Sequence, residues 1–226
     1  MPRLRLRLWS LLLLIPLIVS CSPSPRASVS RGCDDAQAAC LQGKATVQMT
    51  TSRGPITIEV DGDAAPLTAG NFVDLVRRGT YNGTLFHRVV REPVPFVVQG
   101  GDPQSRDRSV PLNQLGSGSF VDPDTGQARM IPLEIRFRSE EQPRYSRVST
   151  NPAELDQLAL RHERGAVAMA RSQAPDSASA QFYIALRPLP ELDGRYAVFG
   201  RVVEGLDVVD KIQQGDRITE ASLKSP

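Results

Sequence analysis

The side chains best suited to chemistry stand in four short blocks of the sequence. Arg88 lies within an apolar run, and Phe96 and Gln99 follow in the next block. Because a guanidinium is planar and always charged, an arginine among apolar side chains is suited to electrostatic stabilisation of a reacting group. The ordinary alternative is a surface arginine on a strand edge. The blocks read FHRVV (86–90), FVVQGGDP (96–103), GAVAMAR (165–171) followed by QFYI (181–184), and LDGRYAVFG (192–200).

Other reaction types lack the residues that they need. Ser117 and Ser119 lie in a Gly-Ser loop, but the sequence has neither the G-x-S-x-G turn of a serine hydrolase nor the G-K-[ST] end of a phosphate-binding loop. The histidines, His87 and His162, stand far apart, so a transition-metal site is not expected. We expect His87 to pack against its neighbours and His162 to stand at a helix end, where a cation favours the dipole. We expect no metal and no cofactor.

Charge and composition exclude further classes. The 226 residues include 27 Lys+Arg and 25 Asp+Glu, and 5% are aromatic. Three of the basic residues, Arg3, Arg5 and Arg7, stand at the N-terminus, so the remainder is close to neutral. Surfaces that bind nucleic acid are basic and carry aromatic side chains, so no nucleic-acid partner is expected. The length suits one globular domain with an appendage.

The N-terminus has the pattern of an export signal. Three arginines precede an apolar run at 8–19, which is broken by Pro16 and is shorter than the roughly 20 residues of a membrane-spanning helix. The sequence LIVSC at 17–21 resembles a bacterial lipoprotein signal, in which Cys21 becomes the lipidated first residue. An uncleaved anchor, or an ordinary signal that leaves Cys21 as a free thiol, stays open. All three alternatives place the folded part outside the cytoplasm.

The predicted organisation is a signal peptide at 1–20, a lipid-anchored flexible tether at 21–43 and a folded domain at 44–226. We expect a monomer on the periplasmic or other extracytoplasmic face of a membrane, held through its N-terminal lipid. The tether is rich in Ser, Pro, Ala and Arg, which is typical of flexible linkers. In an exported protein two of its cysteines, Cys33 and Cys40, could form a small disulfide loop.

Hydrophobic periodicity predicts the elements that must position the four blocks. Apolar residues alternate in a hairpin at 45–60. A helix is expected from its N-cap Thr68 to just before Gly79, and a second from Asn151 to about Ala159. Many short strands with two or three helices favour a β-barrel capped by helices. The other expected elements are short apolar runs at 85–90, 96–98 and 131–135, a polar surface loop at 103–129, a third helix at 206–212 and a last strand at 218–223.

Together and in this order, the four blocks closely resemble the cyclophilin family of peptidyl-prolyl cis-trans isomerases. The resemblance runs from about residue 45 to 218 and covers nearly the whole predicted domain. It implies a mainly β fold, namely a closed eight-stranded antiparallel β-barrel capped by two or three α-helices. The active site is then expected on the outer face of the barrel.

The resemblance also implies a role for each block. Rotation about an X–Pro bond faces a barrier of about 18–20 kcal/mol because amide resonance is lost. Arg88 matches the arginine that donates to the prolyl nitrogen as the amide twists, while Phe96 matches an aromatic wall and Gln99 the amide that orients the arginine. The expected partners are proline-containing polypeptides. The remaining residues that match positions around the bound peptide are Val97, Ala170, Arg171, Gln181, Tyr183, Leu192 and Tyr196.

The sequence departs from the family pattern around this site. Glu191 stands where many members have a Trp that binds cyclosporin-type ligands, so weak binding of such ligands is expected. A proline-peptide binding module or chaperone with little catalysis is the alternative, but the presence of Arg88, Phe96 and Gln99 favours the enzyme. The other substitutions are Val97 for Met, Arg171 for Asn, Tyr183 for Phe and Tyr196 for His. The chain also has three extra residues between Arg88 and Phe96 and one between Met169 and Gln181.

Overall fold

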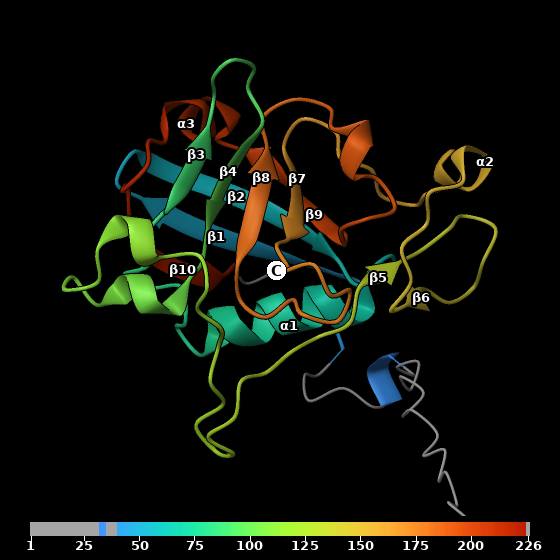
Figure 1. The fold of residues 1–226 in the computed structure, drawn as a ribbon, viewed down its shortest axis with the longest axis horizontal. Coiled ribbons are helices and arrows are strands. Elements are labelled where there is room, and N and C mark those ends of the chain that lie inside the picture. The colour runs from blue at the N-terminus through green and yellow to red at the C-terminus, as the bar shows by residue number, and fades with distance from the viewer. Residues whose placement is uncertain (1–31, 35–39, 225–226) are drawn as a thin grey trace, which may run out of the picture.

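A computed structural model describes residues 32–34 and 40–224, so the predicted signal, Cys21 and most of the predicted tether lie outside the described residues. The fold is mainly β, as expected (Figure 1). None of the described helices is long and apolar enough to cross a bilayer. One sheet consists of β1 (Lys44–Thr51), β2 (Gly54–Asp61), β3 (Arg88–Val90), β4 (Val97–Gly100), β7 (Ala166–Met169), β8 (Phe182–Ala185), β9 (Val198–Glu204) and β10 (Ile218–Leu223), and a second of β5 (Glu134–Ile135) and β6 (Arg144–Tyr145).

The large sheet is curled but open, so the prediction of a closed barrel is wrong. Its eight strands are antiparallel in the order β10-β1-β2-β9-β7-β8-β4-β3, which forms a half-barrel. Among the described residues the edge strands β3 and β10 share no ladder, and one isolated bridge joins Leu85 to Arg217. β3 has only three residues and begins after Leu85, so the pairing at that bridge does not extend into a ladder between β3 and β10.

The first helix, α1 (Pro66–Arg77), lies across one end of the sheet, with α3 (Leu206–Lys211) at the opposite end (Figure 1). Its aromatic anchor is Phe72, whose ring centroid lies 5.0 Å from that of Tyr81, 5.5 Å from Phe182 and 4.9 Å from Phe199. These rings belong to the main core, which fills the concave side of the sheet. The expected glycine beyond the helix end is present, since Gly79 has a φ of +66°.

The start of α1 differs from the prediction that Thr68 caps it. The helix begins at Pro66, a residue suited to the first helical position because its missing N–H needs no partner. The next two N–H groups, of Leu67 and Thr68, donate to the carboxylate of Glu134 at 3.1 and 2.7 Å. Thr68 is therefore inside the helix and fully buried, and the cap comes from a distant carboxylate.

The other two helices are short. α2 (Pro152–Leu155) begins as predicted, because the side chain of Asn151 accepts from the N–H of Ala153 at 3.1 Å. It ends after one turn instead of reaching Ala159. The N–H of Ala159 donates to the carbonyl of Arg136, outside the helix, and so does not continue the helical hydrogen bonds. α3 (Leu206–Lys211) lies where the third helix was expected. The 3₁₀ turns are η1 (Gly32–Asp34), η2 (Pro103–Arg106), η3 (Leu112–Gln114) and η4 (Pro190–Leu192).

The polar loop predicted at 103–129 is mostly exposed, but its end is anchored in the interior. Arg129 is 2% exposed, and its guanidinium pairs with Asp74 of α1 at 2.6 Å and with Asp122 at 3.1 Å. The same guanidinium lies 4.7 Å from the centre of the Phe120 ring. A buried arginine with two carboxylate partners thus holds this loop against α1.

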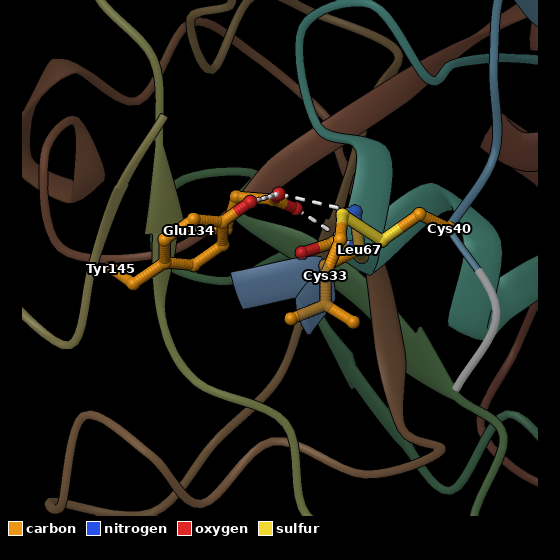
Figure 2. The surroundings of a disulfide bond; sticks show 6 residues. Cys33, Cys40, Leu67, Glu134 and Tyr145 are labelled. Carbon is orange, nitrogen blue, oxygen red and sulfur yellow. Dashed lines mark hydrogen bonds between the residues drawn. A yellow bond between two sulfur atoms is a disulfide. The ribbon is translucent and has the colours of Figure 1, made fainter. Parts of the chain in front are cut away.

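The predicted disulfide between Cys33 and Cys40 is present. Figure 2 shows the bond beside Leu67 in the first turn of α1, close to Glu134. Cys40 packs against the main core, and the N–H of Leu41 donates to the carbonyl of Pro66 at 2.9 Å. The bond therefore lies at the helix start that Glu134 caps.

Candidate active site

Cross-strand pairing places the predicted site residues in one row on the sheet. Arg88 of β3 pairs with Gln99 of β4, Gln99 pairs with Tyr183 of β8, and Tyr183 pairs with Ala168 of β7. Directly paired residues on neighbouring strands project from the same face of a sheet. The four strands lie side by side in Figure 1. Tyr183 and Ala168 belong to a second buried cluster and not to the main core, so the row faces away from the main core.

Arg88 is exposed and held by its neighbours on two sides. Its Nη1 donates to Oε1 of Gln99 at 3.3 Å, and its guanidinium carbon lies 6.0 Å from the centre of the Phe96 ring. The amide of Gln99 donates in turn to Gln181 at 3.2 Å, and Gln181 donates to the carbonyl of Gly118 at 2.8 Å. This chain of amides fixes the orientation of Gln99 and so restricts the guanidinium.

A cavity of about 240 Å³ brings nine of the ten predicted site residues together. The tenth, Gln181, lines an adjoining cavity of about 360 Å³ with Gly116, Ser117 and Gly118. Gln99, Ala170 and Arg171 line both cavities, so the two adjoin. The residues around the smaller cavity are Arg88, Phe96, Val97, Gln99, Ala170, Arg171, Tyr183, Leu192 and Tyr196.

The smaller cavity has an apolar floor that is separate from the main core. Val97, Ala168 and Tyr183 belong to a second buried apolar cluster, against which Phe96 and Leu192 pack. An arginine that borders such a cavity acts in a medium of lower dielectric than water, which strengthens its field. The geometry thus combines a fixed cation with a slot for an apolar ring.

His162 takes part in the site, and the prediction that it ends a helix is wrong. It lies in a buried segment after the short α2, where its Nδ1 is 2.8 Å from Oδ1 of Asp193 and its Nε2 is 2.8 Å from the hydroxyl of Tyr183. The N–H of His162 also donates to Asp193 at 2.9 Å. A buried Asp–His–Tyr chain therefore stands behind the cavity wall, and burial raises the pKa of Tyr183 well above its ordinary value.

The other histidine, His87, is buried next to Arg88, in line with the expected packing role. Burial lowers the pKa of its imidazole, which favours the neutral form. Glu191, at the position of the family Trp, does not line the cavity but pairs with Arg187 at 2.7 Å. Within residues 32–34 and 40–224, no three His, Cys, Asp or Glu side chains are grouped so that they could hold a metal ion.

Comparisons with known proteins identify one family. The model of the cyclophilin-type peptidyl-prolyl cis-trans isomerase family matches residues 46–225. A Synechocystis protein named for the thylakoid lumen and for this isomerase activity is 41% identical over 195 residues, which cover 82% of this chain and 48% of that protein. The chain thus spans about half the length of that relative. A Brucella abortus protein named as a peptidyl-prolyl cis-trans isomerase is 34% identical over 183 residues, covering 80% of this chain and 78% of that protein.

Solved structures show the same fold. A Cryptosporidium parvum cyclophilin-type isomerase, crystallised in the presence of the dipeptide Ala-Pro, superposes with a TM-score of 0.58 at 23% identity and covers 80% of this chain and 99% of its own. At that identity the likeness concerns the fold alone. The family match covers most of the chain and the Brucella relative is similar over most of its length, so this chain belongs to the cyclophilin family of peptidyl-prolyl cis-trans isomerases.

Proposed function

We propose that this isomerase binds proline-containing segments of exported proteins and accelerates X–Pro rotation through Arg88. The observation that carries the proposal is the position of Arg88, which is hydrogen-bonded to Gln99 at the border of a cavity with apolar walls. The Ala-Pro dipeptide in the Cryptosporidium crystals supports a proline-containing ligand. The proline ring is then the group that fills the apolar cavity.

The mechanism is noncovalent. As the X–Pro amide twists, resonance is lost and the prolyl nitrogen regains a lone pair that can accept a hydrogen bond. The guanidinium of Arg88 donates to this lone pair in the twisted state only, which is the condition for acceleration. Phe96, Tyr183 and Leu192 hold the ring and keep water away, so the arginine needs little reorganisation.

The expected contribution of Arg88 to the rate is that of one hydrogen bond from a charged donor. A hydrogen bond to a charged group contributes about 1.5–3 kcal/mol, which corresponds to roughly a 10- to 150-fold change in rate. Arg88→Ala is therefore expected to lower kcat/KM by about that factor. Gln99→Ala is expected to cost less, because it removes the partner that orients the guanidinium and leaves the guanidinium in place.

The test is cis-to-trans relaxation of a short X–Pro peptide, which takes tens to hundreds of seconds without catalyst. Purified full-length protein is compared with Arg88→Ala and with Arg201→Ala, an exposed arginine of β9 outside the cavity. Acceleration that is lost in Arg88→Ala and kept in Arg201→Ala supports the mechanism. A folded wild-type protein that binds the peptide without acceleration would instead establish the binding module or chaperone.

The extracytoplasmic location rests on the N-terminus. The predicted signal at 1–20 and the predicted lipidation of Cys21 support export and membrane anchoring. The Synechocystis relative named for the thylakoid lumen supports a compartment outside the cytoplasm. Mass spectrometry of protein from the membrane fraction is expected to find Cys21 as the lipidated first residue and to lose that signal in Cys21→Ser, and a membrane-bound wild-type protein without lipid at Cys21 would contradict the lipid anchor.

A further inference from the structure

The charged residues that line the two adjoining cavities are all arginines. Arg88 and Arg171 are the charged residues that line the smaller cavity, and Arg171 is the charged residue that lines the larger one. Among the described residues, no Asp or Glu lines either space. A groove lined by one sign of charge favours ligands of the opposite sign.

Arg171 is held rigidly where the two cavities meet. Its Nε and Nη2 donate to the carbonyl of Arg195 at 3.0 and 2.7 Å, and its Nη1 donates to the carbonyls of Ser172 and Gln173 at 2.8 and 3.1 Å. The guanidinium carbon lies 4.7 Å from the centre of the Tyr196 ring. A side chain that is ordered before binding loses little conformational entropy when a ligand arrives.

These contacts orient the positive charge of Arg171 without neutralising it. Its partners are backbone carbonyls and an aromatic ring, and no carboxylate of the described residues forms an ion pair with it. Two other arginines differ, since Arg187 pairs with Glu191 and Arg164 with Asp210, each at 2.7 Å. Arg171 is thus a fixed, uncompensated cation at the peptide site.

The larger cavity offers further groups that suit an anion. Five serines line it, at positions 117, 119, 172, 177 and 179, together with Gln181. Hydroxyls can donate to a carboxylate, and hydrogen bonds to an ionised acceptor are roughly twice as strong as neutral ones. The surroundings of the larger cavity are therefore polar and positive.

We infer that Arg171 makes this isomerase select peptides with an acidic side chain close to the proline. The inference rests on the proposed function: with the proline ring in the smaller cavity, the chain on one side of it passes Arg171 and enters the larger cavity. An Asp or Glu in that part of the peptide forms an ion pair with the guanidinium. The substrate class is then X–Pro segments that carry a carboxylate within a few residues of the proline.

The expected preference is modest and falls on binding. A partly exposed ion pair supports about a 2- to 5-fold preference for Glu over Gln, and serine donors raise it to roughly 10-fold. Since the carboxylate lies away from the bond that rotates, it contacts the ground state and the twisted state equally. The preference is therefore expected in KM with little change in kcat.

The experiment uses full-length protein and a series of short peptides with one proline. Each peptide carries Glu, Gln or Lys at a single position, one to three residues before or after the proline. The variants are Arg171→Gln, Arg171→Lys, which keeps the cation, and Arg195→Gln, whose exposed side chain lines neither cavity. The quantity compared is the Glu/Gln ratio of kcat/KM within one variant, because a general loss of activity cancels in that ratio.

We expect the wild-type protein, Arg171→Lys and Arg195→Gln to prefer Glu at one or two positions on one side of the proline, and Arg171→Gln to have a ratio near one. The preference should also weaken as salt screens the pair. A wild-type ratio near one at every position, or a preference that persists in Arg171→Gln, would overturn the inference. If the wild-type protein accelerates no peptide, the proposed function itself fails, which is a distinct result.

Discussion

The buried chain from Asp193 through His162 to Tyr183 leads to a stability prediction that can be worked out from the structure. The imidazole of His162 is fully buried, and its two nitrogens lie 2.8 Å from Asp193 and from Tyr183. With Nδ1–H donating to the carboxylate of Asp193, Nε2 accepts the hydroxyl proton of Tyr183. Tyr183→Phe keeps the ring that forms the cavity wall and removes only this donor.

The cost of this change comes from the acceptor that stays behind. A buried polar atom that loses its partner destabilises the fold by about 1–3 kcal/mol. For a domain of this size each kcal/mol lowers Tm by about 2–4 °C, so the expected decrease is roughly 2–12 °C. Tyr196→Phe is the matched control, because this ring lies at the same cavity and no hydrogen bond of its hydroxyl to described residues is found. A surface change of this kind costs within about 0.5 kcal/mol.

The assay is urea unfolding of both variants beside the wild type, followed by circular dichroism. The reasoning predicts a lower free energy of unfolding for Tyr183→Phe and an unchanged value for Tyr196→Phe. Equal stability of the two variants would refute it, because the buried hydrogen bond to His162 would then contribute nothing net. A change in the dependence of the free energy of unfolding on urea concentration would indicate a different unfolded state, and the comparison would then be repeated with a second denaturant.

Three further predictions concern the disulfide, a buried carboxyl and a ligand. For a sequence separation of 7, loop entropy predicts that Cys33→Ser/Cys40→Ser lowers the free energy of unfolding by about 2.4 kcal/mol, and an unchanged urea midpoint would contradict this. Burial raises the pKa of Glu134 above its ordinary value of 4.5. The folded protein therefore holds this proton more tightly than the unfolded chain, and the contribution of Glu134 to stability falls as pH rises above about 4.5. Urea titrations at several pH values should show this decrease in the free energy of unfolding in the wild type but not in Glu134→Gln. With Glu191 in place of Trp, titration calorimetry should give a cyclosporin Kd above about 1 μM, and a lower value would contradict the assigned role of that position.

Local patterns predicted the elements whose partners are close in sequence. The hairpin at 45–60, the last strand at 218–223 and the cap at Asn151 were predicted correctly, because alternation and capping depend on neighbouring residues. The row of Arg88, Gln99 and Tyr183 was found through motif order, and strand pairing explains why these residues meet.

The features that the sequence did not predict depend on partners distant in the chain. Thr68 was assigned as a helix cap because the true cap, Glu134, lies 66 residues further on. His162 was placed on a helix because Asp193, its partner, comes 31 residues later. Whether the two edge strands of a sheet pair with each other also depends on residues distant in the chain. Alternation identifies a strand but not the place where its pairing ends, so the sequence does not distinguish a half-barrel from a closed barrel.

The pairing of β1 with β10 means that the large sheet cannot be completed before the C-terminal residues are available. Val47 pairs with Leu223 and Met49 with Ala221, so the first strand of the large sheet depends on the last. A chain that emerges N-terminus first therefore presents one bare edge of β1 until its final residues have left the ribosome or the translocation pore. Such an edge is a template for pairing with other chains, and a product truncated before residue 218 would keep it permanently. An intact C-terminus is thus a condition for covering the edge of β1 and for completing the large sheet.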